Sequence, residues 1–236
     1  MFKQVRVVHA ILFLSAVFTS LSFAGNIAGK VSFKGTKPAA TMIKMNADTK
    51  CVTMHHGKDV ASDMVIVNPN NTLKDVFVYI TKGLEGKKFP TPTAKVTLTQ
   101  EGCMYHPHVF GVMANQPLEI VNSDPTLHNI HALPKNSKQF NIAQPIQGSR
   151  RTETFEKPEV MVKLKCDVHG WMAAYVGVLD NPFYAVTDDK GNFTIKNLPA
   201  GTYEVTAWHE KYGTTTSTMT VGASDTKTVD FTMGGQ

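Results

Sequence analysis

The sequence KCDVHGWM, residues 165–172, places a thiol, an imidazole and a thioether close together. The three side chains are Cys166, His169 and Met172, in the spacing Cys-x2-His-x2-Met. Thiolate and thioether suit Cu(I) and imidazole also suits Cu(II), so one fixed site can hold both oxidation states of copper. A mononuclear site of this kind needs one further histidine from a distant strand.

The upstream stretch 118–131 supplies that histidine. It reads as a strand, a short turn and a second strand that opens with His128. Alternate residues of a strand point to opposite faces, so His128 and Ile130 share one face while Asn129 and His131 share the other. One strand therefore does not offer both histidines to one ion. We choose His128, because it lies where loop meets strand, and expect His131 to be a partly buried or surface polar group.

This arrangement resembles the cupredoxins, and the amicyanins most closely, which have a short Cys-x2-His-x2-Met loop preceded by a His-Asn-Val-His strand. The matching strand here, residues 128–131, reads His-Asn-Ile-His. The resemblance covers less than half of the chain and implies a Greek-key sandwich with a type 1 copper that transfers one electron. It implies His128, Cys166 and His169 in a trigonal plane, with Met172 as the long axial ligand and His169 near the surface to pass the electron.

Two neighbours of these residues have expected supporting roles. We expect Asn129 to hydrogen-bond near the site and hold the ligand loop. Trp171, beside His169, would shield the copper or touch a partner. Taken singly, Cys166 also reads as a buried thiol and Met172 as core filler, but their combination in a loop between strands favours the metal site.

Residues 1–24 are typical of a secretory signal peptide. Lys3 and Arg6 precede a short apolar run, and small residues end the segment, so we expect cleavage after Ala24. An uncleaved anchor is the alternative. Cleavage would place the mature chain in the periplasm or outside the cell, where disulfides persist. We find no later stretch that could span a membrane.

The net charge limits the kinds of partner that the protein can bind. Without the two basic residues of the signal, the chain has 22 basic and 19 acidic residues, a formal charge of +3 spread along its length. This excludes a strong nucleic-acid patch and indicates at most a weak preference for an acidic redox partner, such as a cytochrome or a dehydrogenase. The sequence offers no acid–base pair, so we do not expect an enzyme.

The three cysteines, Cys51, Cys103 and Cys166, leave one thiol over in a secreted protein. If Cys166 binds copper, then Cys51 and Cys103 can form a disulfide. The alternative is a second site for zinc or copper. It would draw on the residues that follow the two cysteines, Met54, His55, His56, Met104, His106 and His108.

Short runs in which apolar and polar residues alternate, separated by turn-forming residues, predict an all-β protein. Residues 182–236 contain the phrases DKGNFTI and LPAGTY and resemble the carboxypeptidase regulatory-like domain, a transthyretin-like β-sandwich. That family opens with an Ile-x-Gly-x-Val strand, which here lies far upstream at residues 27–31. We therefore expect residues 25–90 and 182–236 to form one sandwich around an inserted cupredoxin-like domain at 91–181. The alternative is a tandem, with residues 25–90 packed on the inserted domain.

Besides the strand that opens with His128, nine strands are expected before residue 180, with a long polar connection over residues 134–150. We expect the Trp208-His209-Glu210 stretch to be structural or exposed. The expected strands cover residues 29–35, 64–67, 76–80, 95–99, 109–113, 118–121, 152–155, 159–165 and 173–179.

The sequence thus favours a periplasmic one-electron carrier with copper as its cofactor. Copper delivery or storage is the first alternative, using the Met-, His- and Cys-containing segment 42–56 as well. A cell-envelope binding module without metal is the second.

Overall fold

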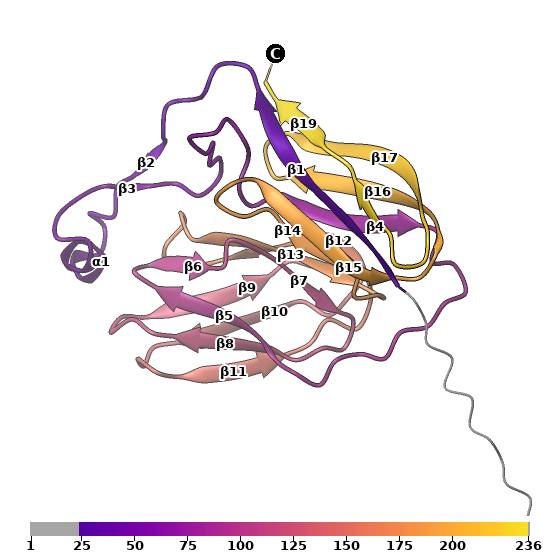
Figure 1. The fold of residues 1–236 in the computed structure, drawn as a ribbon. Helices are drawn as coiled ribbons and strands as arrows, with labels where there is room; N and C mark the ends of the chain where they lie inside the picture. The colour runs from indigo at the N-terminus through magenta and orange to yellow at the C-terminus, as the bar shows by residue number, and fades with distance from the viewer. Residues whose placement is uncertain (1–23, 236) are drawn as a thin grey trace, which may run out of the picture.

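The computed structural model describes residues 24–235, and the expected signal peptide lies outside them except for Ala24. The described chain is all-β apart from one short helix, and it forms two β-sandwiches that pack face to face (Figure 1). We call them the middle sandwich, built from β5 to β13, and the split sandwich, built from both ends of the chain. No helix within the described part is long and apolar enough to cross a membrane.

The middle sandwich consists of two sheets with a closed apolar core between them. One sheet has the order β10-β9-β12-β13-β7 and the other the order β11-β8-β5-β6. Alternation places Leu98, Ile120 and Ile130 in the core. The strands are β5 (Val96–Glu101), β6 (Met104–His106), β7 (Val109–Met113), β8 (Leu118–Asn122), β9 (His128–Ala132), β10 (Phe140–Gln144), β11 (Arg150–Glu153), β12 (Glu159–Lys165) and β13 (Ala173–Leu179).

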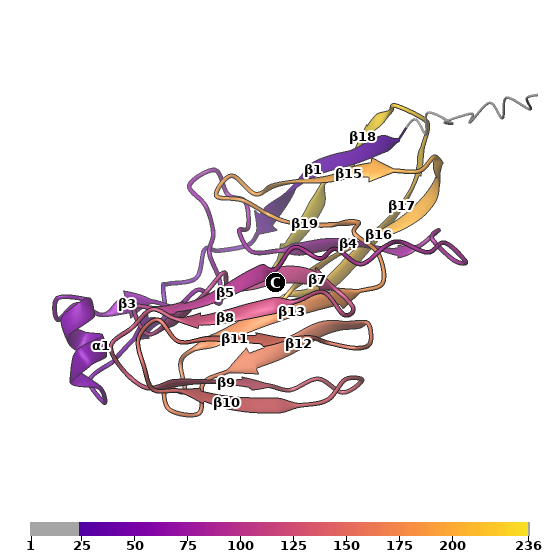
Figure 2. The same cartoon turned by 90° about the horizontal axis from the view of Figure 1, so that it is seen from below.

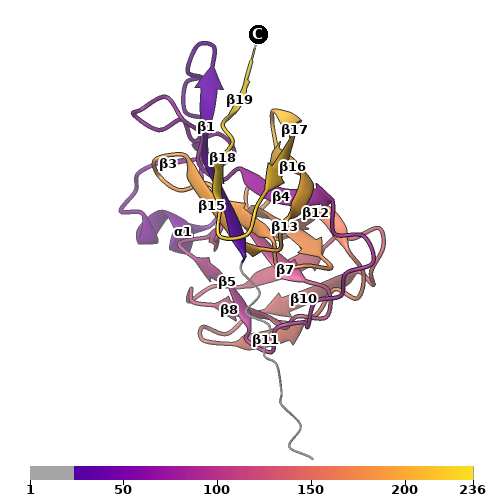
Figure 3. The ribbon, with the colours of Figure 1, turned by 45° about the vertical axis from the view of Figure 1, so that its right-hand side comes forward.

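The split sandwich combines strands from before and after the middle sandwich. Strand β1 pairs with β15, β18 and β19, so the first and the last strands of the described chain lie side by side (Figure 3). Strand β4 pairs with β14 and β16 in the second sheet, order β14-β4-β16-β17. The strands are β1 (Gly25–Lys34), β4 (Phe77–Lys82), β14 (Tyr184–Val186), β15 (Asn192–Leu198), β16 (Gly201–His209), β17 (Gly213–Val221), β18 (Thr226–Thr228) and β19 (Phe231–Gly234).

The two sandwiches meet over an aromatic interface. Two glycines in register, Gly111 on β7 and Gly177 on β13, leave room for rings of the split sandwich. Phe77 lies over Gly177 and stacks on Tyr184, whose hydroxyl donates to the Gly111 carbonyl over 2.8 Å. His108 of the middle sandwich also forms a buried ion pair with Glu210, at 2.5 Å.

Residues 42–61, which we call the cap, leave the split sandwich after β1 and pack on one end of the middle sandwich (Figures 1 and 2). They contain a two-stranded sheet and the helix α1, and Met45 and Cys51 enter the core of the middle sandwich. The expectation that all of residues 25–90 serve the second sandwich is therefore wrong for the cap. Its elements are β2 (Met42–Ile43), α1 (Thr49–Met54) and β3 (Val60–Ala61).

Other strand predictions also need correction. The apolar run at residues 64–67 is not a strand, because only Val67 makes an isolated bridge, to Leu73 across a turn. The long connection expected at 134–150 contains β10, which lies at the edge of its sheet with Asn141 and Ala143 exposed. Strand β6 was not predicted either, because it has only three residues.

Candidate metal centre

A tight loop between β12 and β13 brings the Cys-His-Met stretch to the end of the middle sandwich that the cap covers. The Cys166 N–H donates to the Met172 carbonyl over 3.2 Å, and the Met172 N–H donates to the His169 carbonyl over 2.9 Å. These bonds close the loop on itself. His128 opens β9, the strand beside β12, so its ring reaches the same place from a neighbouring strand.

Three of the sequence-predicted ligands form one cluster. The Nδ1 atoms of His128 and His169 lie 3.0 Å apart, and Cys166 Sγ lies 3.9 Å from His169 Nδ1. All three ligand atoms lie within 4.8 Å of one another. A first-row ion such as zinc forms bonds of about 2.0 Å to imidazole nitrogen and about 2.3 Å to thiolate sulfur. One ion placed between the three atoms can therefore bond to both Nδ1 atoms and to Sγ. Met172, completely buried, shares the apolar core with Cys166.

The thiol of Cys166 is prepared for metal binding. Burial alone would raise its pKa, but hydrogen bonds from His128 and His169 outweigh burial and lower the pKa to about 5. The backbone N–H of His169 also donates to Sγ over 3.3 Å. Since the thiolate is the form that binds metals, the side chain is ready to act as a ligand at neutral pH.

Asn129 holds the ligand loop from the neighbouring strand. Its side-chain oxygen accepts the N–H of Asp167 over 2.7 Å and that of Val168 over 3.3 Å, and lies 3.2 Å from Cys166 Sγ. Tyr105 in turn donates to the Asn129 carbonyl. His131, two residues further on, is partly exposed and pairs with Asp167, away from the cluster.

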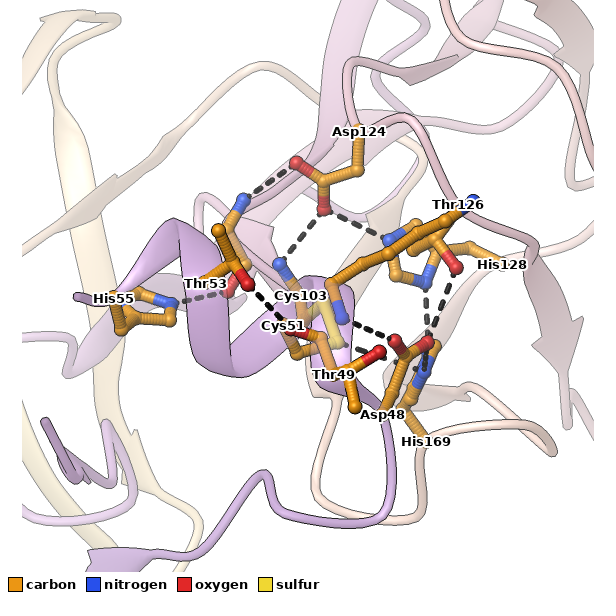
Figure 4. The surroundings of a disulfide bond; sticks show 12 residues. Asp48, Thr49, Cys51, Thr53, His55, Cys103, Asp124, Thr126, His128 and His169 are labelled. Carbon is orange, nitrogen blue, oxygen red and sulfur yellow. Dashed lines mark hydrogen bonds and ion pairs between the residues drawn. A yellow bond between two sulfur atoms is a disulfide. The ribbon is translucent and has the colours of Figure 1, made fainter. Parts of the chain in front are cut away.

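Each cluster histidine has a carboxylate on its second nitrogen, which the sequence reasoning missed. Asp124 lies 2.8 Å from His128 Nε2, and Asp48 lies 3.0 Å from His169 Nε2 (Figure 4). Burial alone would lower the pKa of both histidines, but their anionic neighbours raise it. When Nδ1 has lost its proton, each ring can offer this atom to a metal ion while its Nε2–H stays on the carboxylate. The short spacing of Asp124 and His128 was a visible signal, but nothing in the sequence marked Asp48.

The cap buries His169, and the expectation that this ring lies near the surface is wrong. Only 2 % of His169 is exposed. The Cys51–Cys103 disulfide is present, with the Cα atoms 5.7 Å apart, and Cys51 Sγ lies 3.6 Å from His169 Nε2. Because the two sulfurs are bonded to each other, the alternative of a second metal site on these cysteines is not supported.

Trp171 connects the ligand loop to the turn between β5 and β6. Its indole packs on His169 with ring centroids 5.1 Å apart, and its Nε1–H donates to the Cys103 carbonyl over 3.0 Å. The side chain is only partly buried. It therefore links the covered imidazole to the protein surface.

The fold and the cluster define a class: a two-sandwich protein with a buried Cys-His-His site beside a methionine. Comparison with protein families matches residues 173–234 to the carboxypeptidase regulatory-like domain. That match starts within β13, a strand that pairs in the middle sandwich. No curated protein matches the chain.

Solved structures similar to this chain include cupredoxins. A purple cupredoxin from Nitrosopumilus maritimus is 22% identical over 35% of this chain and 98% of its own, with a TM-score of 0.31. A mutant amicyanin in its Cu(I) form is 14% identical over 37% and 85%, with a TM-score of 0.32. The chain spans only 25% of a copper-containing nitrite reductase from Thermus scotoductus SA-01, which is 21% identical over 44% of this chain with a TM-score of 0.35. At these TM-scores the likenesses carry no conclusion about function.

Proposed function

We propose that the protein binds one copper ion through His128, Cys166, His169 and Met172 and carries single electrons in the periplasm. The observation that carries the proposal is the buried cluster of one thiolate and two imidazole nitrogens within 4.8 Å, beside a buried thioether. Soft sulfur ligands together with imidazole suit copper in both oxidation states. When bound, the copper supplies a centre that gains and loses one electron.

The protein residues keep this site fixed and dry. Asn129 holds the loop, while Asp124 and Asp48 hold the two rings, so little has to move when the charge changes. Because the ligands are at most 2 % exposed, a substrate would have to displace the cap to reach the metal. These features support a carrier and not an enzyme, with Trp171 as part of the route for the electron. The partner would be another redox protein.

Copper delivery is the weaker proposal, because two of the candidate ligands in the cap, Cys51 and His55, are already engaged. Cys51 is bonded to Cys103, and His55 Nε2 is engaged with the Gly102 carbonyl at 2.7 Å. Delivery would require these contacts to open.

The test is the visible spectrum of the protein loaded with Cu(II), beside Cys166→Ser and a control, His131→Gln. An intense thiolate-to-copper band is expected in the natural protein and in the control, and its loss is expected in Cys166→Ser. His131 is a suitable control because it lies two residues from Asn129 on the same strand but pairs with Asp167 outside the cluster. Absence of the band and of retained copper in the natural protein would refute the proposal and favour a binding module without metal.

A further inference from the structure

The two carboxylates on the cluster histidines come from different parts of the chain. Asp124 lies four residues before His128, in the loop that leads into β9. Asp48 is 121 residues from His169 in sequence and belongs to the cap. The cap therefore supplies a contact to the site that the middle sandwich does not make by itself.

Both carboxylate oxygens of Asp48 are engaged. As the N-cap of α1, it accepts the Lys50 N–H through Oδ1 over 2.8 Å. Its Oδ2 accepts from the Thr126 hydroxyl over 3.1 Å and faces His169 Nε2 at 3.0 Å (Figure 4). Lys50 Nζ, in turn, donates to the Pro125 carbonyl over 2.6 Å. These bonds fix the direction in which Asp48 faces the imidazole.

The disulfide links the two carboxylate–imidazole pairs. Cys51 lies in α1, three residues after Asp48, and its partner Cys103 donates its backbone N–H to Asp124 over 2.7 Å. The Cys51–Cys103 bond thus ties the helix that presents Asp48 to the backbone that holds Asp124. The bond therefore restrains both carboxylates, and through them the two rings, in addition to the hydrogen bonds already named.

We propose that Asp48 is a positioning residue for His169, held in place by the disulfide-tethered cap, and that it lowers the reduction potential of the copper site. This inference rests on the proposed function. A carboxylate that accepts Nε2–H makes the imidazole a more basic ligand. In a buried site its negative charge also stabilises the more highly charged Cu(II) over Cu(I).

Electrochemistry of the copper-loaded protein tests the charge effect, with Asp48→Asn compared against Asp59→Asn. Asp59 is an exposed carboxylate of the same cap, so the control makes the same change in net charge. Loss of such an outer contact costs about tenfold in metal affinity, here mainly for Cu(II). The reduction potential of Asp48→Asn should therefore rise by about 59 mV, which for one electron corresponds to a tenfold change in relative affinity. Asp48→Glu, which keeps the negative charge, should bring the potential part of the way back to the natural value. Equal potentials in Asp48→Asn and Asp59→Asn would overturn the inference.

Proton NMR of the metal-free protein tests the positioning independently of copper. The His169 Nε2–H should give a hydrogen-bonded, slowly exchanging signal in the natural protein and in Asp59→Asn. It should broaden or vanish in Asp48→Ala and in the double variant Cys51→Ser/Cys103→Ser. A signal that survives in Asp48→Ala would refute the positioning role even if copper binds. If the signal is lost in Asp48→Ala but the natural protein binds no copper, the contact between Asp48 and His169 is supported and the proposed function is refuted.

Discussion

The aromatic interface predicts that the substitution Gly177→Ala destabilises the whole protein. A Cβ on Gly177 would lie 2.5 Å from Phe77 Cε1 and closer still to Cζ. Ordinary carbon contacts are about 3.5–4.0 Å, so the ring would have to shift by about 1 Å. Phe77 is fully buried and stacked on Tyr184 at 5.3 Å, and Tyr184 is itself hydrogen-bonded to Gly111, so this shift is resisted.

Overpacking of this kind costs about 1–3 kcal/mol. The lower chain entropy of alanine returns roughly 0.5–1 kcal/mol, so the expected net loss is about 1–2 kcal/mol. For a chain of this size that corresponds to a fall in Tm of roughly 2–8 °C. The assay is urea and thermal unfolding followed by circular dichroism, with Gly170→Ala as the control, because a Cβ there meets nothing within 4 Å.

A double-mutant cycle separates the ring contact from other effects of the substitution. Phe77→Leu removes the ring that the new methyl group would meet, so Gly177→Ala should cost less in that background. The reasoning is refuted if Gly177→Ala is as stable as the natural protein, or if its cost is unchanged when Phe77 is replaced by leucine.

Three further predictions concern the ion pair, the disulfide and the ligand loop. Burial alone would lower the pKa of His108, but the hydrogen bond and the charge of Glu210 outweigh burial and raise it. The pair therefore stabilises the folded state fully below about pH 6.5, the pKa of histidine in an unfolded chain. This stabilisation is lost as the pH rises through the pKa of His108 in the folded protein. Glu210→Gln should therefore cost about 2–3 kcal/mol of unfolding free energy at pH 6 and less at pH 8.5, and an equal cost at both values would contradict the assignment. Replacing Cys51 and Cys103 by serine opens a loop with a sequence separation of 52 and should lower the unfolding free energy by about 4 kcal/mol, measured in urea against the natural protein with and without reductant. Asn129→Ala leaves the N–H groups of Asp167 and Val168 without their acceptor and should weaken copper binding about 10- to 100-fold in competition with a chelator, whereas unchanged affinity would show that the loop holds itself.

The core of the candidate site could be predicted because its residues are local in sequence or follow strand periodicity. Cys166, His169 and Met172 lie in one loop. Alternation correctly put His128 and His131 on opposite faces, and the choice of His128 at the loop-to-strand junction agrees with its complete burial. The role of Asn129 in holding the loop followed from its place on the same strand. Such features need only the period of a strand and the ligand preferences of a metal.

The cap could not be predicted because its position is set by long-range contacts. The helix α1 has six residues, too few for a helical pattern to show, and it is fixed by the bond from Cys51 to Cys103. The cysteine count favoured that disulfide but could not say that it lies against His169. The strand predicted at residues 64–67 was wrong for a related reason. A run with high β-propensity forms a strand only where another strand is available to pair with it. Here the chain turns directly after the run, and the Asn68 N–H bonds to the Thr72 carbonyl within that turn.

The candidate site is covered by a segment that precedes the middle sandwich in the chain. The chain must leave β1 and return to β4, since both strands belong to the split sandwich. The cap is the part of this connection that reaches the end of the middle sandwich where the Cys-His-His cluster lies. The strands at both ends of the connection are held in a folded unit, so the cap is restrained by the split sandwich as well as by the disulfide. The split sandwich thus contributes to the candidate site without touching it. Through the cap it brings Asp48 to His169, and the aromatic interface at Gly177 keeps the two sandwiches in register.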